Sequence, residues 1–147
     1  MDSLKSILLA EDSLEDIQLT LTALERCHLA NRVMVVRDGA DALDYLHRRS
    51  SFKDRINAQP VVVFLDIKMP KVDGLEVLRQ IKADPKLQII PVVMVTSSRE
   101  QQDLLRSYKL GANSYVVKPI DFDQFVNAIQ ELGLYWAVLN EPPPGCE

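Results

Sequence analysis

Five short apolar runs are spaced along this chain of 147 residues, and none of them alternates with polar residues. The runs cover residues 7–10, 33–36, 61–65, 92–95 and 115–117. All but the first are rich in valine or aromatic residues, which favour strands. Strands that are apolar on both faces are typical of parallel sheets covered on both sides. The runs therefore predict five buried parallel strands.

Helical patterns separate and follow these runs. Apolar residues recur at helical spacing from residues 14, 40, 75, 104 and 122, with Ser13 and Asp121 placed to cap the first and last helix. Leu104, Leu105 and Tyr108 mark the apolar side of the fourth helix. Strand and helix thus alternate five times, which predicts an α/β fold: an open, doubly wound, five-stranded parallel sheet with helices on both faces.

Composition excludes several classes of protein. Seventeen basic against twenty-one acidic residues give a net charge of −4, which disfavours binding to nucleic acid. The longest apolar run, 134–139, is too short to span a membrane, and the N-terminus lacks a secretory signal, so a cytoplasmic location is expected. Cys27 and Cys146 form no CxxC motif, which argues against a zinc site or a disulfide scaffold.

The end of the chain keeps helical spacing. Apolar residues continue in register through Gly133 to Leu139, so we expect the last helix to reach about Leu139 before prolines stop it. The competing interpretation ends the helix at Gly133. We expect one domain over residues 1–134, and over residues 135–147 an extension of the last helix plus a Pro-rich tail. Because so short an extension is not expected to fold into a DNA-binding module, we expect the protein to act on its target by protein–protein contact.

Apolar side chains in that extension need cover. A homodimer that buries Tyr135, Trp136 and Leu139 is favoured over folding back onto the same subunit.

Polar residues follow four of the predicted strands. They are Glu11 and Asp12 after the first, Asp66 after the third, Thr96 at the end of the fourth, and Lys118 after the fifth. The carboxyl ends of parallel strands meet at one edge, where α/β proteins bind ligands. Each residue alone has a structural explanation, such as a helix cap or a turn. Asp66 is the hardest to explain in that way, because it ends a strongly apolar run and aspartate is rarely buried unpaired.

The charges of this group indicate what it can hold. Three carboxylates carry −3, and two of them about 5 Å apart repel by about 3 kcal/mol at an effective dielectric constant near 20. Lys118 offsets one charge, and a divalent cation would offset the rest. Oxygen ligands alone suit Mg²⁺ or Mn²⁺. Beside such a cation Asp66 could attack phosphorus, with Lys118 and Thr96 binding the phosphoryl oxygens.

The sequence around Asp66 matches a known pattern. Residues 66–74 read DIKMPKVDG, which is the D-x-x-M-P-x-x-D-G pattern of the response-regulator receiver domain of two-component signalling. The pair Glu11-Asp12, Thr96 in a VTSS segment, Tyr115 and Lys118-Pro119 complete a resemblance that extends over about residues 5–134. The long loop before the third strand and the ending at residues 135–144 resemble the small receiver proteins paired with cyanobacterial phytochromes.

The resemblance implies a flavodoxin-like strand order, 2-1-3-4-5, and a role for each site residue. Asp66 would accept a phosphoryl group from a histidine kinase, here a phytochrome, and Lys118 would pair with Asp66 and then with the phosphoryl group. Glu11, Asp12, Asp66 and the main-chain carbonyl of Lys68 would bind Mg²⁺. Thr96 and Tyr115 would form the switch. The downstream partner would be another protein, which the resemblance does not identify. The Lys118–Pro119 bond is expected to be cis.

Two other classes share this architecture. An Mg²⁺-dependent phosphohydrolase with an aspartyl nucleophile of the haloacid dehalogenase type needs a second aspartate at position 68, where this chain has lysine. A flavodoxin-like cofactor carrier needs a phosphate-binding loop where this chain has Glu11-Asp12. The loop over residues 47–60 remains open to two interpretations, a solvated connection or a partner-docking loop.

Overall fold

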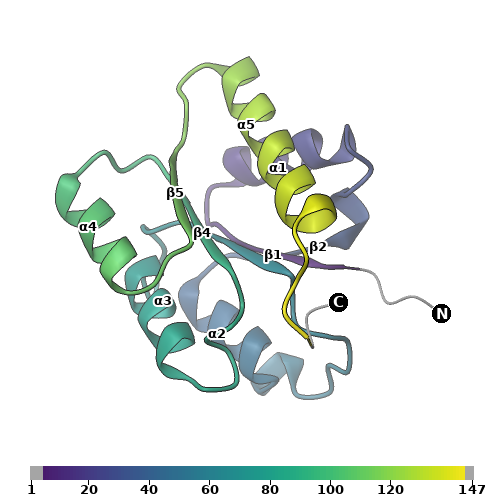
Figure 1. Cartoon of the computed structure of the whole chain (residues 1–147), viewed down its shortest axis with the longest axis vertical. Helices are drawn as coiled ribbons and strands as arrows, with labels where there is room; N and C mark the ends of the chain where they lie inside the picture. The colour runs from purple at the N-terminus through teal and green to yellow at the C-terminus, as the bar shows by residue number, and fades with distance from the viewer. Residues whose placement is uncertain (1–4, 145–147) are drawn as a thin grey trace.

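Each apolar run forms a strand in the computed structural model, which describes residues 5–144; Cys146 lies outside this range. The strands are β1 (Ile7–Ala10), β2 (Val33–Val36), β3 (Val62–Leu65), β4 (Val92–Thr96) and β5 (Ser114–Val117). They form one parallel sheet in the order β2-β1-β3-β4-β5 (Figure 1). The predicted doubly wound fold and its strand order are therefore confirmed.

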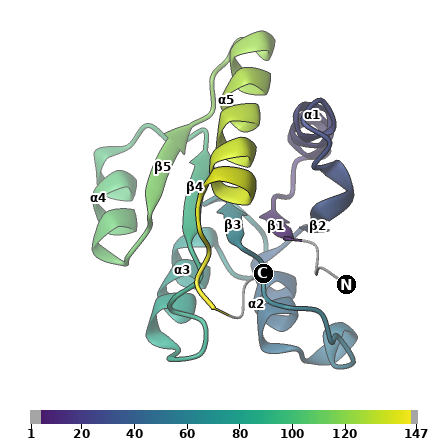
Figure 2. The same ribbon diagram turned by 45° about the vertical axis from the view of Figure 1, so that its right-hand side comes forward.

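Five helices cover the sheet in two layers. They are α1 (Leu14–Glu25), α2 (Gly39–His47), α3 (Gly74–Ala83), α4 (Gln101–Lys109) and α5 (Phe122–Leu134). Helices α1 and α5 lie side by side on one face, and α2, α3 and α4 cover the other (Figures 1 and 2). The central strands β1, β3 and β4 are buried along their length, as apolar runs without alternation predict.

Side-chain caps fix where the helices begin. The oxygens of Ser13, Asp38, Asp73 and Asp121 each accept a hydrogen bond from the backbone N–H three residues further on. The predicted caps Ser13 and Asp121 are confirmed. These caps matter for function because α1, α3 and α5 all begin at the carboxyl edge of the sheet, where the polar residues gather.

Helix α4 forms as predicted, but its apolar residues point away from the core. Leu104, Leu105 and Tyr108 are 39%, 56% and 51% exposed, and the buried side chain of this helix is the small Ser107. The Ser107 hydroxyl donates to the Asp103 carbonyl at 2.7 Å, so its own helix satisfies it. Helical spacing shows which residues share a face but not where that face points. The exposed surface of α4 consequently includes these three apolar side chains.

The last helix continues through Gly133, as predicted, and the interpretation that ended it there is wrong. After Leu134 a π-helical segment, Tyr135–Leu139, follows directly. A Cβ atom at Gly133 would lie 2.5 Å from Cδ2 of Leu24, so glycine lets α1 approach α5 closely. Trp136 is half-buried against the core of its own subunit, whereas Tyr135 and Leu139 are 50% and 75% exposed.

The long loop before β3 is tied to α2 by Arg55. The Arg55 Nε donates to the Tyr45 carbonyl at 3.0 Å, and the guanidinium carbon lies 4.0 Å from the centroid of the Tyr45 ring. The same side chain also binds the loop itself, at the Ala58 carbonyl and the Gln59 side chain. This loop is therefore a folded structure and not merely a solvated connection. Within residues 5–144, no helix has the length and apolar character needed to cross a membrane.

Candidate functional site

Backbone hydrogen bonds bring the predicted polar residues to one edge of the sheet. Each residue that follows a strand donates its N–H to the last carbonyl of a neighbouring strand. Glu11 donates to Val36 at 3.0 Å, Asp66 to Ala10 at 3.1 Å, and Lys118 to Thr96 at 2.7 Å. The parallel ladder thus continues one residue beyond the strands and fixes where these side chains start.

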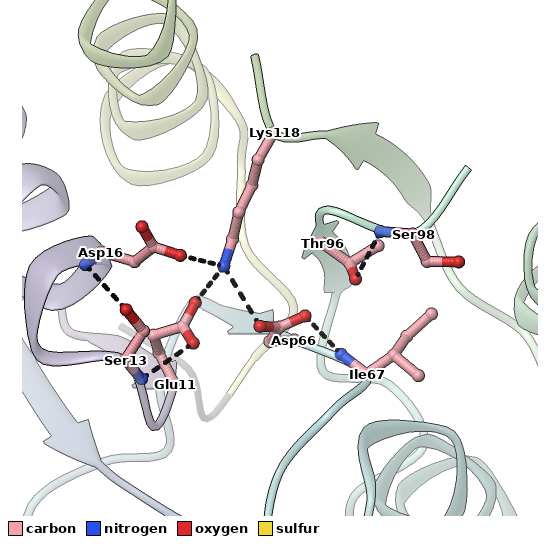
Figure 3. Close-up of polar contacts among 8 residues, drawn as sticks. All are labelled: Glu11, Ser13, Asp16, Asp66, Ile67, Thr96, Ser98 and Lys118. Carbon is pink, nitrogen blue, oxygen red and sulfur yellow. Dashed lines mark hydrogen bonds and ion pairs between the residues drawn. The ribbon is translucent and has the colours of Figure 1, made fainter. Parts of the chain in front are cut away.

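The Lys118 ammonium is the centre of the site (Figure 3). Its Nζ donates to the carboxylates of Glu11, Asp16 at 2.7 Å and Asp66 at 3.1 Å. Lys118, Glu11 and Asp66 are all buried. A buried lysine is stable only where it is paired, and this one has three anionic partners.

Asp66 has a defined orientation. Its Oδ1 accepts from the backbone N–H of Ile67 at 2.7 Å, and its Oδ2 faces Lys118. The turn after Asp66 folds back so tightly that a Cβ atom at Gly74 would lie 2.0 Å from the Asp66 carbonyl oxygen. The Gly74 N–H donates to the Ile67 carbonyl at 2.7 Å and closes this turn. Glycine is therefore required where α3 begins.

Three carboxylates of the site could hold a cation. One oxygen each of Glu11, Asp12 and Asp66 lies within 4.8 Å of the others. Burial, together with the charge of Asp66, raises the pKa of Glu11 to about 7, although Lys118 opposes the shift. Carboxylates crowded in this way and rich in oxygen donors fit a hard divalent cation, which would relieve their repulsion.

The pKa of Lys118 shifts upward despite its burial. Burial alone would lower it, but hydrogen bonds to Asp16 and Glu11 and the charge of Asp66 outweigh that effect. The ammonium therefore stays protonated, and the local positive charge is permanent at physiological pH.

Thr96 and Tyr115 are linked through the loop that joins β4 to α4. The Thr96 hydroxyl oxygen accepts from the Ser98 N–H at 3.2 Å, and the Tyr115 hydroxyl donates to the Ser98 carbonyl at 3.1 Å. The Ser98 hydroxyl in turn donates to Asp103 at 2.6 Å on α4. Thr96 lies at the end of the strand next to β3, beside Asp66 (Figure 3). Ser98 therefore connects Thr96, Tyr115 and α4 by hydrogen bonds.

The structure corrects one expectation about the site and adds one residue. The Lys118–Pro119 bond is trans, as is every peptide bond within the described residues, so the predicted cis bond is wrong. The end of β5 and the three carboxylates are sufficient to orient the ammonium without it. The sequence analysis missed Asp16. Its position three residues after the cap Ser13 places it in the first turn of α1 and was the available signal.

Among the other predicted residues, Glu11, Asp12, Asp66 and Lys118 come together as expected, and Lys68 lies in the turn that follows Asp66, with an exposed side chain. Tyr135 and Leu139 follow the C-terminal end of α5, whereas the cap Asp121 stands at the other end of this helix, at the carboxyl edge of the sheet. Figure 1 shows the course of α5 between these two ends. The structure therefore separates the predicted chemical site from the predicted interface.

Comparison with known proteins gives a family match over most of the chain. The model of the response regulator receiver domain matches residues 7–130. The response regulator Rcp1 of Synechocystis sp. is 33% identical over 132 residues, which is 90% of this chain and 88% of Rcp1. The solved Mn²⁺-bound form of Rcp1 superposes with a TM-score of 0.88 at 32% identity and covers 95% of this chain and 99% of that one.

Two further solved structures are similar. The phosphorylated cyanobacterial phytochrome response regulator RcpA is 34% identical, with a TM-score of 0.89, over 96% of this chain and 99% of that one. The bacteriophytochrome response regulator RtBRR is 59% identical, with a TM-score of 0.76, over 97% of this chain and 86% of that one. RtBRR thus has a lower TM-score than RcpA despite its higher sequence identity.

Proposed function

Because the chain belongs to the response regulator receiver domain family, whose members are signalling switches, we propose that Asp66 accepts a phosphoryl group from a histidine kinase. The observation that carries this proposal is the buried Asp66 carboxylate, which lies 3.1 Å from the Lys118 ammonium and beside two further carboxylates. A carboxylate in this setting is a nucleophile, and the ammonium beside it can stabilise the oxygens of the phosphoryl group that it accepts.

The transfer exchanges one bond to phosphorus for another. A carboxylate oxygen of Asp66 forms a bond to phosphorus while the phosphorus–nitrogen bond of a phosphohistidine breaks, and the imidazole nitrogen leaves with the bonding electron pair. Lys118 then contacts the new phosphoryl oxygens in place of the free carboxylate. A buried ammonium that stays protonated stabilises the charge of the transferring group throughout. Self-dephosphorylation uses the same residues, with water as the nucleophile.

We assign a Mg²⁺ or Mn²⁺ site to Glu11, Asp12, Asp66 and the main-chain carbonyl of Lys68. The three clustered carboxylates and the raised pKa of Glu11 support this assignment. When bound, the cation supplies charge neutralisation for the transferring group. The chain's own residues orient the acceptor: Ile67 holds one Asp66 oxygen and Lys118 the other.

Thr96 and Tyr115 form the switch in this proposal. The Thr96 hydroxyl loses its hydrogen bond from the Ser98 N–H and turns to the phosphoryl oxygens. Tyr115 changes position in turn, because its hydroxyl is hydrogen-bonded to the Ser98 carbonyl. The signal would then appear on the face of α4, β5 and α5. The exposed apolar surface of α4 at Leu104, Leu105 and Tyr108 supports this face as the site of output by protein contact.

The kinase would dock at the carboxyl edge, and we propose that it is a phytochrome. Leu14 and Phe122, the first residues of α1 and α5, are 58% and 50% exposed, and Ile120 in the turn before α5 is 95% exposed. These side chains offer an apolar surface close to Lys118. A kinase bound to this surface could reach Asp66. The phytochrome partner rests on the similarity to RcpA and RtBRR, which are themselves described as phytochrome and bacteriophytochrome response regulators.

We also propose a homodimer through the segment after α5. The exposed side chains of Tyr135 and Leu139 support this proposal. Trp136 is half-buried against its own subunit, so its contribution to such an interface is smaller than the sequence suggests.

Acetyl phosphate tests the acceptor directly. With Mg²⁺ it should label the wild type and an Asp54→Asn control in the exposed loop, whereas Asp66→Asn should stay unlabelled. Full labelling of Asp66→Asn would refute the assignment. Continuous turnover of small phosphate esters by the wild type would instead favour the phosphohydrolase alternative.

A further inference from the structure

Asp16 differs from the other carboxylates around Lys118 in where it comes from. Glu11 and Asp66 follow strands, but Asp16 lies in the first turn of α1. Its Oδ2 is 2.7 Å from Lys118 Nζ, closer than the 3.1 Å between Lys118 and Asp66. Its side chain is 28% exposed, against 7% for that of Lys118, so it binds the ammonium from the solvent side.

The contact completes the hydrogen bonding of the ammonium. A lysine ammonium has three N–H donors, and here Glu11, Asp16 and Asp66 supply three acceptors. With two donors held by Glu11 and Asp16, the third points at Asp66. Without Asp16, one donor would have no carboxylate partner and the ammonium could turn about its bond to Glu11. Asp16 therefore limits the directions in which the third N–H can point.

Asp16 is itself held by its neighbours. Its backbone N–H donates to the Ser13 hydroxyl at 3.3 Å, and the Ser13 N–H donates to Oε2 of Glu11 at 3.3 Å. Since Glu11 also binds Lys118, the four residues form a closed ring of contacts at the start of α1 (Figure 3). The helix cap thus fixes the backbone of Asp16, from which its carboxylate reaches Lys118.

We propose that Asp16 is a positioning residue that aims the Lys118 ammonium at Asp66 and at the phosphoryl group that Asp66 carries. This inference rests on the proposed function. Two of the three ammonium donors stay with Glu11 and Asp16 during transfer, and the third passes from the Asp66 carboxylate to a phosphoryl oxygen. An alternative role is purely electrostatic: one more negative charge would tighten cation binding and oppose the incoming phosphoryl group.

Two substitutions separate aiming from charge. Asp16→Asn removes the charge but keeps an oxygen that can accept from Lys118, whereas Asp16→Ala removes both. We measure the rate of Asp66 labelling by acetyl phosphate at saturating Mg²⁺, as a function of acetyl phosphate concentration. Asp16→Ala should lower the maximal rate about tenfold, the order expected when a charged group loses one orienting hydrogen bond. Asp16→Asn should stay within about threefold of the wild type. Glu15→Ala, in the same helical turn and exposed, is the matched control and should leave the rate unchanged.

Each outcome decides between the two roles. Equal slowing, or equal acceleration, of both Asp16 variants would show that charge alone matters and would overturn the proposal, as would wild-type rates in both. Thermal unfolding of each variant identifies any loss of structure. If Asp16→Ala is unfolded, Asp16→Ser takes its place. Serine has a short polar side chain that cannot reach Lys118 as aspartate does, so the same loss of rate is expected. If the wild type takes up no phosphoryl group, the proposed function itself is wrong. If the wild type is labelled normally and both Asp16 variants are unaffected, only the positioning role of Asp16 is wrong.

Discussion

One ammonium surrounded by carboxylates determines the behaviour of the site at the scale of single residues. Lys118 offsets only part of the negative charge, and burial, together with the remaining repulsion from Asp66, raises the pKa of Glu11 to about 7. In the pH range between its ordinary value of 4.5 and about 7, the folded state binds the Glu11 proton more tightly than the unfolded state does. When no cation is bound, the contribution of Glu11 to the free energy of unfolding therefore falls as the pH rises through this range.

Cation binding should show the opposite dependence on pH. A metal ligand must be deprotonated, so protons compete with Mg²⁺ at Glu11 below about pH 7. We expect the affinity for Mg²⁺, measured by calorimetry, to be about tenfold higher at about pH 8 than at about pH 6. Glu11→Gln should flatten this dependence. Equal wild-type affinity at both pH values would contradict the assignment of Glu11 to the cation site.

Most of the site could be predicted because its residues follow strands. Glu11, Asp12, Asp66 and Lys118 stand directly after apolar runs, and parallel strands bring such positions to one edge. Asp16 could not be found in the same way, because a helix residue reaches this edge only through the packing of α1 against the sheet. Its acidic side chain in a first helical turn also has an ordinary explanation, the helix dipole.

At the scale of elements, the turn between β3 and α3 is a tight constraint on the backbone beside Asp66. The start of α3 passes so close to Asp66 that position 74 has no room for a side chain. The sequence pattern contained this glycine, but the reason for it, a contact between two backbones, appears only in the structure. Helix α4 shows the reverse: its existence was predictable, and the outward direction of Leu104, Leu105 and Tyr108 was not, because burial depends on which side of α4 meets the sheet.

Gly74→Ala should be strongly destabilising. Its Cβ atom would lie 2.0 Å from the Asp66 carbonyl oxygen, and backbone atoms on both sides must move to relieve the overlap. We expect a loss of about 2–4 kcal/mol in the free energy of unfolding, measured in urea, and weaker Mg²⁺ binding since Asp66 must shift. A change below about 0.5 kcal/mol would show that the turn is looser than the structure indicates.

At the scale of the whole molecule, chemistry and contact surfaces are separate. The carboxylates gather at one edge of the sheet. The last segment, which carries the exposed Tyr135 and Leu139, follows the C-terminal end of α5, and Figure 2 shows that this helix runs across one face of the sheet. Because the segment after α5 is half-buried on its own subunit through Trp136 and Ala137, only its outer side is free to meet a second copy. Sequence spacing predicted the helical continuation but could not divide its residues between the two sides.

The proposed dimer predicts that a charge placed in the last segment and a charge placed on α4 have different effects. Leu139→Glu, at a position 75% exposed, should weaken self-association at least tenfold in sedimentation velocity, roughly what a charge placed in an apolar contact costs. Leu105→Glu on the apolar surface of α4 is the matched control and should leave the distribution unchanged. Loss of the dimer only in Leu105→Glu would move the interface to α4, and an unchanged profile in Leu139→Glu would count against the last segment as an interface.

The most direct measurement of the central claim is chemical identification of the acceptor. The wild type is incubated with acetyl phosphate and Mg²⁺, reduced with borohydride, which converts an aspartyl phosphate to homoserine, and mapped by peptide mass spectrometry. Homoserine should appear at position 66 and should be absent when Mg²⁺ is withheld. Homoserine at position 12 or 16 with an unmodified Asp66, or reduction of no residue in a fully folded sample, would contradict the account.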